Sequence, residues 1–101
     1  MTDLAATFYL SSEHLHLVRS ILKTKLPDVD AYVFGSRVGP NPKKQSDLDI
    51  ALTATEPIDW RVMADLREAL EESDLPIRVD LVDWSTCSDE FKRHVSIRVP
   101  L

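Results

Sequence analysis

The segment DLDIALT, residues 47–53, has apolar residues at a period of two, which predicts a β-strand with one buried face. Burial of the apolar set turns Asp47 and Asp49 to the opposite face, about 6.5 Å apart along the strand. Asp is unfavourable within strands, and two neighbouring carboxylates repel each other. The pair therefore indicates a functional site. The apolar set is Leu48, Ile50 and Leu52.

A second predicted strand, DAYVFGS at residues 30–36, ends in Gly35 and Ser36. Ten residues separate Ser36 from Asp47, whereas a parallel crossover needs about a dozen or more. The two strands are therefore expected to be antiparallel neighbours, with Ser36 beside Asp47. The connecting residues are rich in Gly and Pro, which predicts a loop or at most one helical turn.

The other segments predict three helices and a third strand. The third strand is expected over residues 77–83, with Asp80 on the face opposite its apolar residues. Residues 1–101 are then one domain of the α/β (α+β) class, with a small mixed sheet of about three strands flanked by helices. The helices are expected from Ser11 or Ser12 to about Lys25, from Thr55 or Glu56 with Pro57 along a stripe of Val62, Leu66 and Leu70, and from Ser88 to about Ser96.

Three carboxylates at one end of the sheet, those of Asp47, Asp49 and Asp80, suit a divalent cation. An all-oxygen ligand set favours Mg²⁺, which shares its coordination shell with substrate phosphates. Gly35 lets the backbone approach a phosphate, and Ser36 and Arg37 supply donors to its oxygens. These residues indicate a nucleoside triphosphate site, with room for two metal ions about 3.5–4 Å apart.

Composition limits the other functions. The net charge of −5 argues against direct nucleic-acid binding, which needs clustered Lys and Arg. The N-terminus lacks a signal-peptide pattern, and no apolar run is long enough to span a membrane. The lone Cys87 fits a reducing compartment, so a cytoplasmic location is expected.

Gly35-Ser36, ten residues and then Asp47-Leu48-Asp49, with Asp80 on a later strand, resembles the DNA polymerase β-type nucleotidyltransferase superfamily. The short length narrows the resemblance to the minimal nucleotidyltransferases, the MntA-like antitoxins that are paired with HEPN-domain toxins. It implies the nucleotidyltransferase fold and an enzyme that transfers AMP from ATP to a tyrosine hydroxyl of the partner toxin, silencing its RNase. It also implies that Asp47, Asp49 and Asp80 are catalytic Mg²⁺ ligands, and that Gly35 and Ser36 hold the triphosphate.

Two other functions remain open at this stage. The chain is either an antitoxin that neutralises its partner by complex formation without catalysis, or the catalytic half of an enzyme that modifies a small molecule such as an aminoglycoside. Because so short a chain has little room for a second substrate, the acceptor surface is expected to come from another chain.

Several conspicuous residues have a structural interpretation. Asp28 and Asp30 also form Asp-x-Asp, but no Gly-Ser precedes them, so a solvated turn is expected. Trp60 and Trp84 are interpreted as packing residues. Asp83 is the alternative to Asp80 as third carboxylate, and Arg78 is expected to balance the charge of Asp80.

Overall fold

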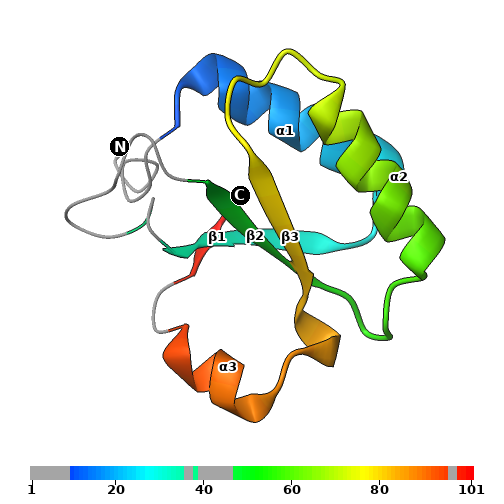
Figure 1. The fold of residues 1–101 in the computed structure, drawn as a ribbon, viewed down its shortest axis with the longest axis vertical. Coiled ribbons are helices and arrows are strands. Elements are labelled where there is room, and N and C mark those ends of the chain that lie inside the picture. Colours follow the sequence, from blue (N-terminus) through cyan, green and yellow to red (C-terminus); the bar gives the residue numbers. More distant parts are fainter. Residues whose placement is uncertain (1–9, 36–37, 39–46, 96–97) are drawn as a thin grey trace.

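The computed structural model describes residues 10–35, 38, 47–95 and 98–101, and Figure 1 shows how their helices and strands are arranged. In chain order the elements are α1 (Ser12–Lys25), β1 (Asp30–Phe34), β2 (Leu48–Thr53), α2 (Trp60–Glu71), β3 (Val79–Asp83), the 3-10 helix η3 (Trp84–Thr86), α3 (Asp89–His94) and β4 (Val99–Pro100).

The strands form one mixed sheet in the order β3-β2-β1-β4. β1 is antiparallel to β2 and to β4, whereas β2 is parallel to β3. The α/β class and the antiparallel pairing of the first two strands are therefore confirmed. The expected count of about three strands is wrong by one, because β4 is only two residues long and pairs only with Tyr32 and Val33. So short a strand leaves no periodic pattern in the sequence.

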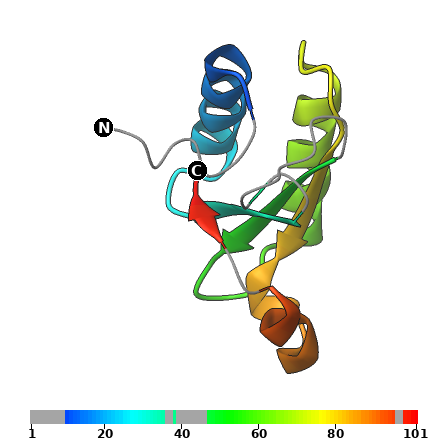
Figure 2. The same cartoon turned by 90° about the vertical axis from the view of Figure 1, so that its left-hand side faces the viewer.

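The hydrophobic core lies between one face of the sheet and the helices α1 and α2, which run side by side on that side of the molecule (Figures 1 and 2). β2 is the central contributor, because its alternating apolar side chains are almost completely buried. The core consists of Val18, Leu22, Val33, Leu48, Ile50, Leu52, Met63, Leu66, Leu70 and Leu81. Burial of this set fixes the register of β2 and hence the direction of its aspartates.

Ser11, one of the two residues predicted to cap the first helix, is its N-cap, and Ser88, the predicted first residue of the last helix, is the N-cap of α3. The Ser11 hydroxyl accepts a hydrogen bond from the His14 N–H at 3.3 Å, and the Ser88 hydroxyl accepts one from the Phe91 N–H at 3.0 Å. The predicted start of the second helix at Thr55, Glu56 or Pro57 is wrong.

Helix α2 begins only at Trp60, with Asp59 as its N-cap. The N–H of Ile58, the residue before Asp59, donates to the Asp83 carboxylate at 2.7 Å and so holds Ile58 at the end of β3. Asp59 then caps the helix by accepting from the Arg61 N–H at 2.8 Å. A contact between residues far apart in sequence therefore sets the start of this helix.

Three strand boundaries also differ from the prediction, one of them by a single residue, since β2 begins at Leu48 and not at Asp47. β1 ends at Phe34, because Gly35 has a left-handed φ of +84° that leaves the extended conformation. β3 begins at Val79 and not at Ile77, since its parallel partner β2 offers no residue before Leu48. The Leu48 N–H donates to the Arg78 carbonyl at 2.9 Å, where the ladder begins.

The second face of the sheet is partly covered by η3 and α3. The rings of Phe34 and Phe91 meet edge-on at 6.0 Å, and Trp84 contacts Phe91 at 6.3 Å. The packing role of Trp84 is confirmed, but that of Trp60 is wrong, because its side chain is 72% exposed. No helix within the described ranges is long and apolar enough to cross a membrane.

Candidate active site

The aspartates predicted from strand alternation lie together on the face opposite the core. Asp49 on β2 is in register with Asp80 on β3, and Asp47 directly precedes β2. Directly registered residues of neighbouring strands lie about 5 Å apart. The parallel β2–β3 pairing, which sequence spacing did not reveal, is what brings Asp80 to the same end of the sheet as the Asp47–Asp49 pair.

Gly35 packs its backbone directly against the Asp49 carboxylate. Phe34 is the register partner of Asp49, so Gly35 follows at the same end of the β1–β2 ladder. A β-carbon built on Gly35 would collide with Oδ2 of Asp49 and lie 3.1 Å from its Cγ. The left-handed φ of Gly35 is itself unfavourable for other residues. Only glycine therefore satisfies both the turn and the close approach to Asp49.

The carboxylates create an electrostatic cost at Asp49. Partial burial raises the pKa of Asp49 above its ordinary value, and the negative charges of Asp80 and then Asp47 raise this pKa further. All three effects disfavour the ionised carboxylate. A divalent cation bound between these groups would reverse the charge repulsion.

The site fits a metal ion that shares its ligands with a substrate. Across the described ranges, no three His, Cys, Asp or Glu side chains are gathered closely enough to hold a metal by themselves. Mg²⁺ is commonly bound through one or two carboxylates together with substrate phosphates, so a complete protein cage is not required. The oxygen donors of Asp47, Asp49 and Asp80 match this mode. Ser36 and Arg37, predicted as phosphate ligands, lie outside the described residues.

The structure separates Asp80 from its neighbour Asp83. Asp83 caps η3: its Oδ1 accepts from the Ser85 N–H at 3.0 Å and from the Ser85 hydroxyl at 2.7 Å. Its Oδ2 accepts from the Ile58 N–H at 2.7 Å. The side chain of Asp80 is half exposed, and its one described ion pair, with Arg78, is long at 3.9 Å. Asp80 is thus the carboxylate available for chemistry.

A matched pair of substitutions tests this division. Asp83→Ala is expected to lower the free energy of unfolding by about 1–3 kcal/mol, because it leaves the part-buried Ile58 N–H without its hydrogen-bond acceptor. Asp80→Ala is expected to change stability by less than about 0.5 kcal/mol, as for a surface substitution, yet to abolish any activity at the site. Urea unfolding of both variants, measured beside their activity, checks the contrast. Equal destabilisation would contradict it.

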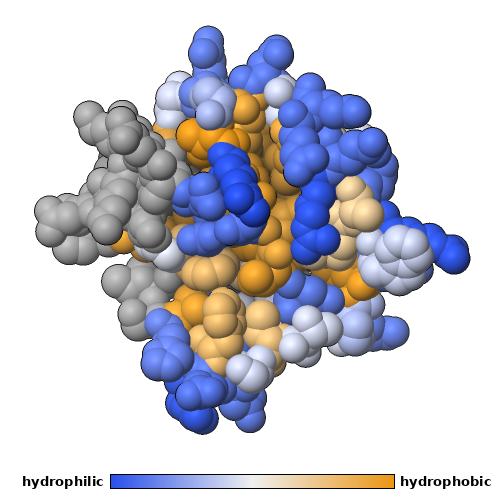
Figure 3. Space-filling model, in the orientation of Figure 1, coloured by the Kyte–Doolittle hydropathy of each residue, from blue (hydrophilic) through white to orange (hydrophobic). Residues whose placement is uncertain are grey.

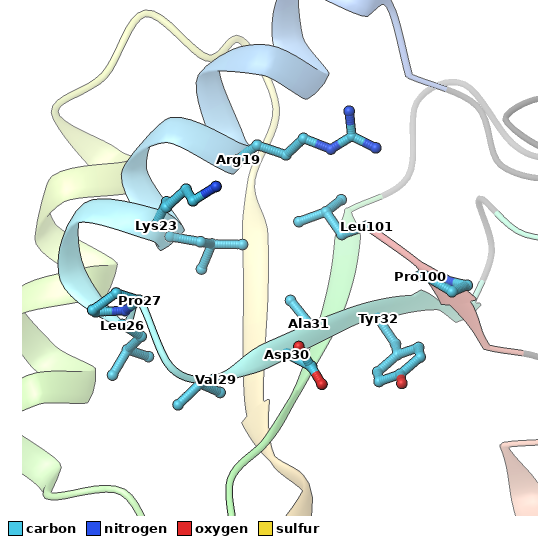
Figure 4. Close-up of a pocket in the computed structure, with 11 residues that line it drawn as sticks. Arg19, Lys23, Leu26, Pro27, Val29, Asp30, Ala31, Tyr32, Pro100 and Leu101 are labelled. Carbon is cyan, nitrogen blue, oxygen red and sulfur yellow. The ribbon is translucent and has the colours of Figure 1, made fainter.

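Among the described residues, two hollows flank the sheet, and one of these two includes a site carboxylate. A pocket of about 560 Å³ opens between α1, β1 and the C-terminal residues, with Arg19 and Lys23 reaching over it (Figure 4). It contains none of the three aspartates. A smaller groove of about 310 Å³ lies between α2 and the free edge of β3, and Asp80 forms part of its wall. The groove is lined by Arg67, Leu70, Glu71, Leu75, Ile77, Arg78, Val79 and Asp80.

Sequence reasoning did not single out Arg98, which the structure places on the same sheet face as the carboxylates. Its guanidinium lies 4.6 Å from the ring centroid of Trp84 and 5.2 Å from that of Tyr32. Arg98 directly precedes Val99, the first residue of β4. Because β4 was not predicted, the sequence did not indicate which face of the sheet Arg98 lies on.

Comparison with known proteins agrees with this geometry. The sequence profile of the polymerase β nucleotidyltransferase family matches residues 17–99, a range that spans every aspartate of the site. The chain is 48% identical to the probable protein adenylyltransferase MntA of Haemophilus influenzae over 83 residues. This aligned region covers 82% of this chain and 73% of the relative.

Solved structures show the same similarity. A mutant of the MntA–HpeT toxin–antitoxin complex contains a chain that matches with a TM-score of 0.65 at 28% identity, covering 86% of this chain and 69% of the other. The complex of tri-AMPylated Shewanella oneidensis HEPN toxin with MNT antitoxin matches with a TM-score of 0.60 at 24% identity, covering 90% and 71%. At that identity the second match shows the fold alone.

Proposed function

We propose that this chain, which belongs to the polymerase β nucleotidyltransferase family, transfers AMP from ATP to a tyrosine hydroxyl of a partner HEPN toxin and so neutralises the toxin's RNase. The observation that carries the proposal is the registered pair Asp49 and Asp80 with Gly35 packed against Asp49. The named relatives support the choice of acceptor, because one is a probable protein adenylyltransferase and others are antitoxins of toxin–antitoxin complexes.

The reaction is an in-line displacement at the α-phosphorus of ATP. The tyrosine oxygen forms a bond to the α-phosphorus, and the bond from that phosphorus to the oxygen bridging to the β-phosphate breaks. Pyrophosphate leaves with the bonding electron pair. Asp80 accepts the phenolic proton, since its carboxylate is half exposed and free of the structural hydrogen bonds that occupy Asp83.

The other residues position the nucleotide. Asp47 and Asp49 would hold Mg²⁺, which would supply positive charge to neutralise the phosphates and stabilise the leaving oxygen. Gly35 brings its backbone to the triphosphate because it has no side chain to keep the phosphate away. Ser36, as the family pattern implies, and Arg37, as a charged donor, donate to the phosphate oxygens in this proposal.

The groove beside Asp80 is our proposed entry for the acceptor. It runs between α2 and the outer edge of β3, so a partner segment lying in it meets the edge of the strand that carries Asp80. Its apolar wall suits an aromatic ring, and that wall consists of Leu70, Leu75, Ile77 and Val79. The partner then supplies the acceptor tyrosine and the remainder of its binding surface.

The test is the intact mass of the partner chain that co-purifies with this protein. After incubation with Mg-ATP, the partner's mass is expected to increase by one or more AMP units, and the increase is expected to disappear when EDTA replaces Mg²⁺. Peptide mapping then locates the modified tyrosine. A stable complex with no mass change would overturn catalysis and leave an antitoxin that acts by binding.

A further inference from the structure

Arg98 is an exposed cation that lies against two aromatic rings on the face that carries the carboxylates. Its guanidinium carbon lies 4.6 Å from the Trp84 ring centroid and 5.2 Å from the Tyr32 ring centroid. Two aromatic contacts of this kind restrict a long side chain that would otherwise lose considerable rotamer entropy on binding a ligand. Arg98 is therefore preorganised.

The strand register places Arg98 beside the candidate phosphate turn. Val99 pairs with Val33, so Arg98, one residue earlier in an antiparallel pair, lies next to Phe34. Phe34 is in turn the partner of Asp49, and Gly35 follows it. The backbone of Phe34, the residue before Gly35, is thus flanked by Asp49 on the β2 side and by Arg98 on the β4 side, while the Arg98 guanidinium lies against Tyr32 and Trp84.

Alternation places Arg98 on the same face as Asp49. Val99 and Val33 are paired on the core side, and both pack on or within the hydrophobic core. The residues next to them, Arg98 and Phe34, therefore point to the other face, which also bears Asp49. Figure 3 shows apolar side chains in the middle of the molecule, with hydrophilic side chains among and around them.

Within the part of the chain that the structure describes, the guanidinium of Arg98 forms no ion pair. Among the described residues, no carboxylate lies within 4.0 Å of it, since the two ion pairs are Lys25–Asp65 and Arg78–Asp80. A fixed guanidinium has five N–H donors arranged to bind phosphate oxygens. Its contacts with the two aromatic rings are not hydrogen bonds, so they do not use its N–H donors.

We propose that Arg98 binds the β- and γ-phosphates of ATP and stabilises the pyrophosphate as it leaves. This inference rests on the proposed nucleotidyl transfer and adds a residue to it. When the α-phosphorus bond breaks, negative charge grows on the departing pyrophosphate oxygen, and a preorganised cation lowers the energy of that state. The carboxylate Asp49 is on the β2 side of β1, and Arg98 approaches from the β4 side.

The first experiment measures binding and not turnover. Isothermal titration with Mg²⁺ and α,β-methylene-ATP, which cannot transfer AMP, is expected to show about 10-fold or greater loss of affinity in Arg98→Gln, since a charged hydrogen bond is lost. AMP, which lacks the β- and γ-phosphates, is expected to bind both forms equally. The matched control is Lys92→Gln, because Lys92 lies 5.6 Å from the same Trp84 ring but on α3.

A second readout reports the site itself. The chain contains two tryptophans, so Trp60→Phe leaves Trp84 as the single fluorophore. Triphosphate binding is expected to shift Trp84 emission in this background, and Arg98→Gln is expected to remove the shift. Thermal unfolding of each variant separates a loss of ligand binding from a loss of folding, and Arg98→Lys, which keeps the charge, is used if Arg98→Gln does not fold.

The outcomes separate this inference from the proposed function. Equal affinity of folded Arg98→Gln and wild type for the analogue would overturn the role of Arg98 while leaving AMP transfer intact. Weaker analogue binding by Arg98→Gln, with no modified partner in wild type, would support the role of Arg98 and overturn the AMP transfer. Failure of wild type to bind the analogue would overturn both.

Discussion

The double substitution Asp47→Ala/Asp49→Ala is expected to reduce AMP transfer to the partner by at least about 10³-fold. The reason is that it removes two carboxylates that the proposal assigns to stabilising charge in the transition state. Both side chains lie on the face opposite the core, so their removal leaves the packing of β2 unchanged. The variant is expected to fold with wild-type stability or better, since removal of Asp49 relieves the effects that raise its pKa.

The matched control is Asp28→Ala/Asp30→Ala. This pair repeats the Asp-x-Asp pattern in this chain, but Asp28 lies in an exposed turn and Asp30 at the start of β1, paired with Thr53 at the far end from Gly35. It is expected to keep full activity. The partner's mass and RNase activity are measured for both variants. If Asp47→Ala/Asp49→Ala still neutralises the toxin, complex formation is sufficient and the transfer is not the antitoxin mechanism.

Gly35→Ala is expected to lower the free energy of unfolding by about 1–3 kcal/mol and to abolish AMP transfer. The new β-carbon needs the space that Oδ2 of Asp49 occupies, and the φ of +84° is unfavourable for alanine. Relief of the collision moves the Asp49 carboxylate away from its place beside Asp80. Urea unfolding and the mass assay measure the two effects separately.

Gly35→Asn distinguishes the two causes. Asn tolerates a left-handed φ better than Ala does, but it carries the same β-carbon. If the collision with Asp49 dominates, Asn is expected to recover part of the stability and none of the activity. Recovery of activity by Asn would show that backbone conformation alone requires glycine at this position.

The carboxylate pair illustrates how much of the site could be predicted from sequence. Alternation in residues 47–53 depends only on a strand's period of two and on burial of its apolar face, both of which are local properties. The short connection from Ser36 likewise indicated an antiparallel neighbour. The structure confirms both the burial pattern of β2 and its pairing with β1.

The role of Asp83 could not be predicted in this way. Asp80 and Asp83 lie three residues apart, and both suit a carboxylate site by sequence. The distinction depends on the Ile58 N–H, 25 residues earlier in the chain, which takes up one oxygen of Asp83. The same contact delays the start of α2 to Trp60, so a single long-range hydrogen bond explains both differences.

The sequence by itself determined the class of fold, the orientation of Asp47 and Asp49 and the resemblance to the nucleotidyltransferases, because periodicity, turn chemistry and motif spacing are written along the chain. Only the tertiary structure decided which residues meet across strands: Asp49 with Asp80 through the parallel β2–β3 pair, Gly35 against Asp49, and Arg98 beside Phe34 through β4. Strand register is set by burial of the core as a whole, so these contacts between distant segments exist only once the whole sheet has formed.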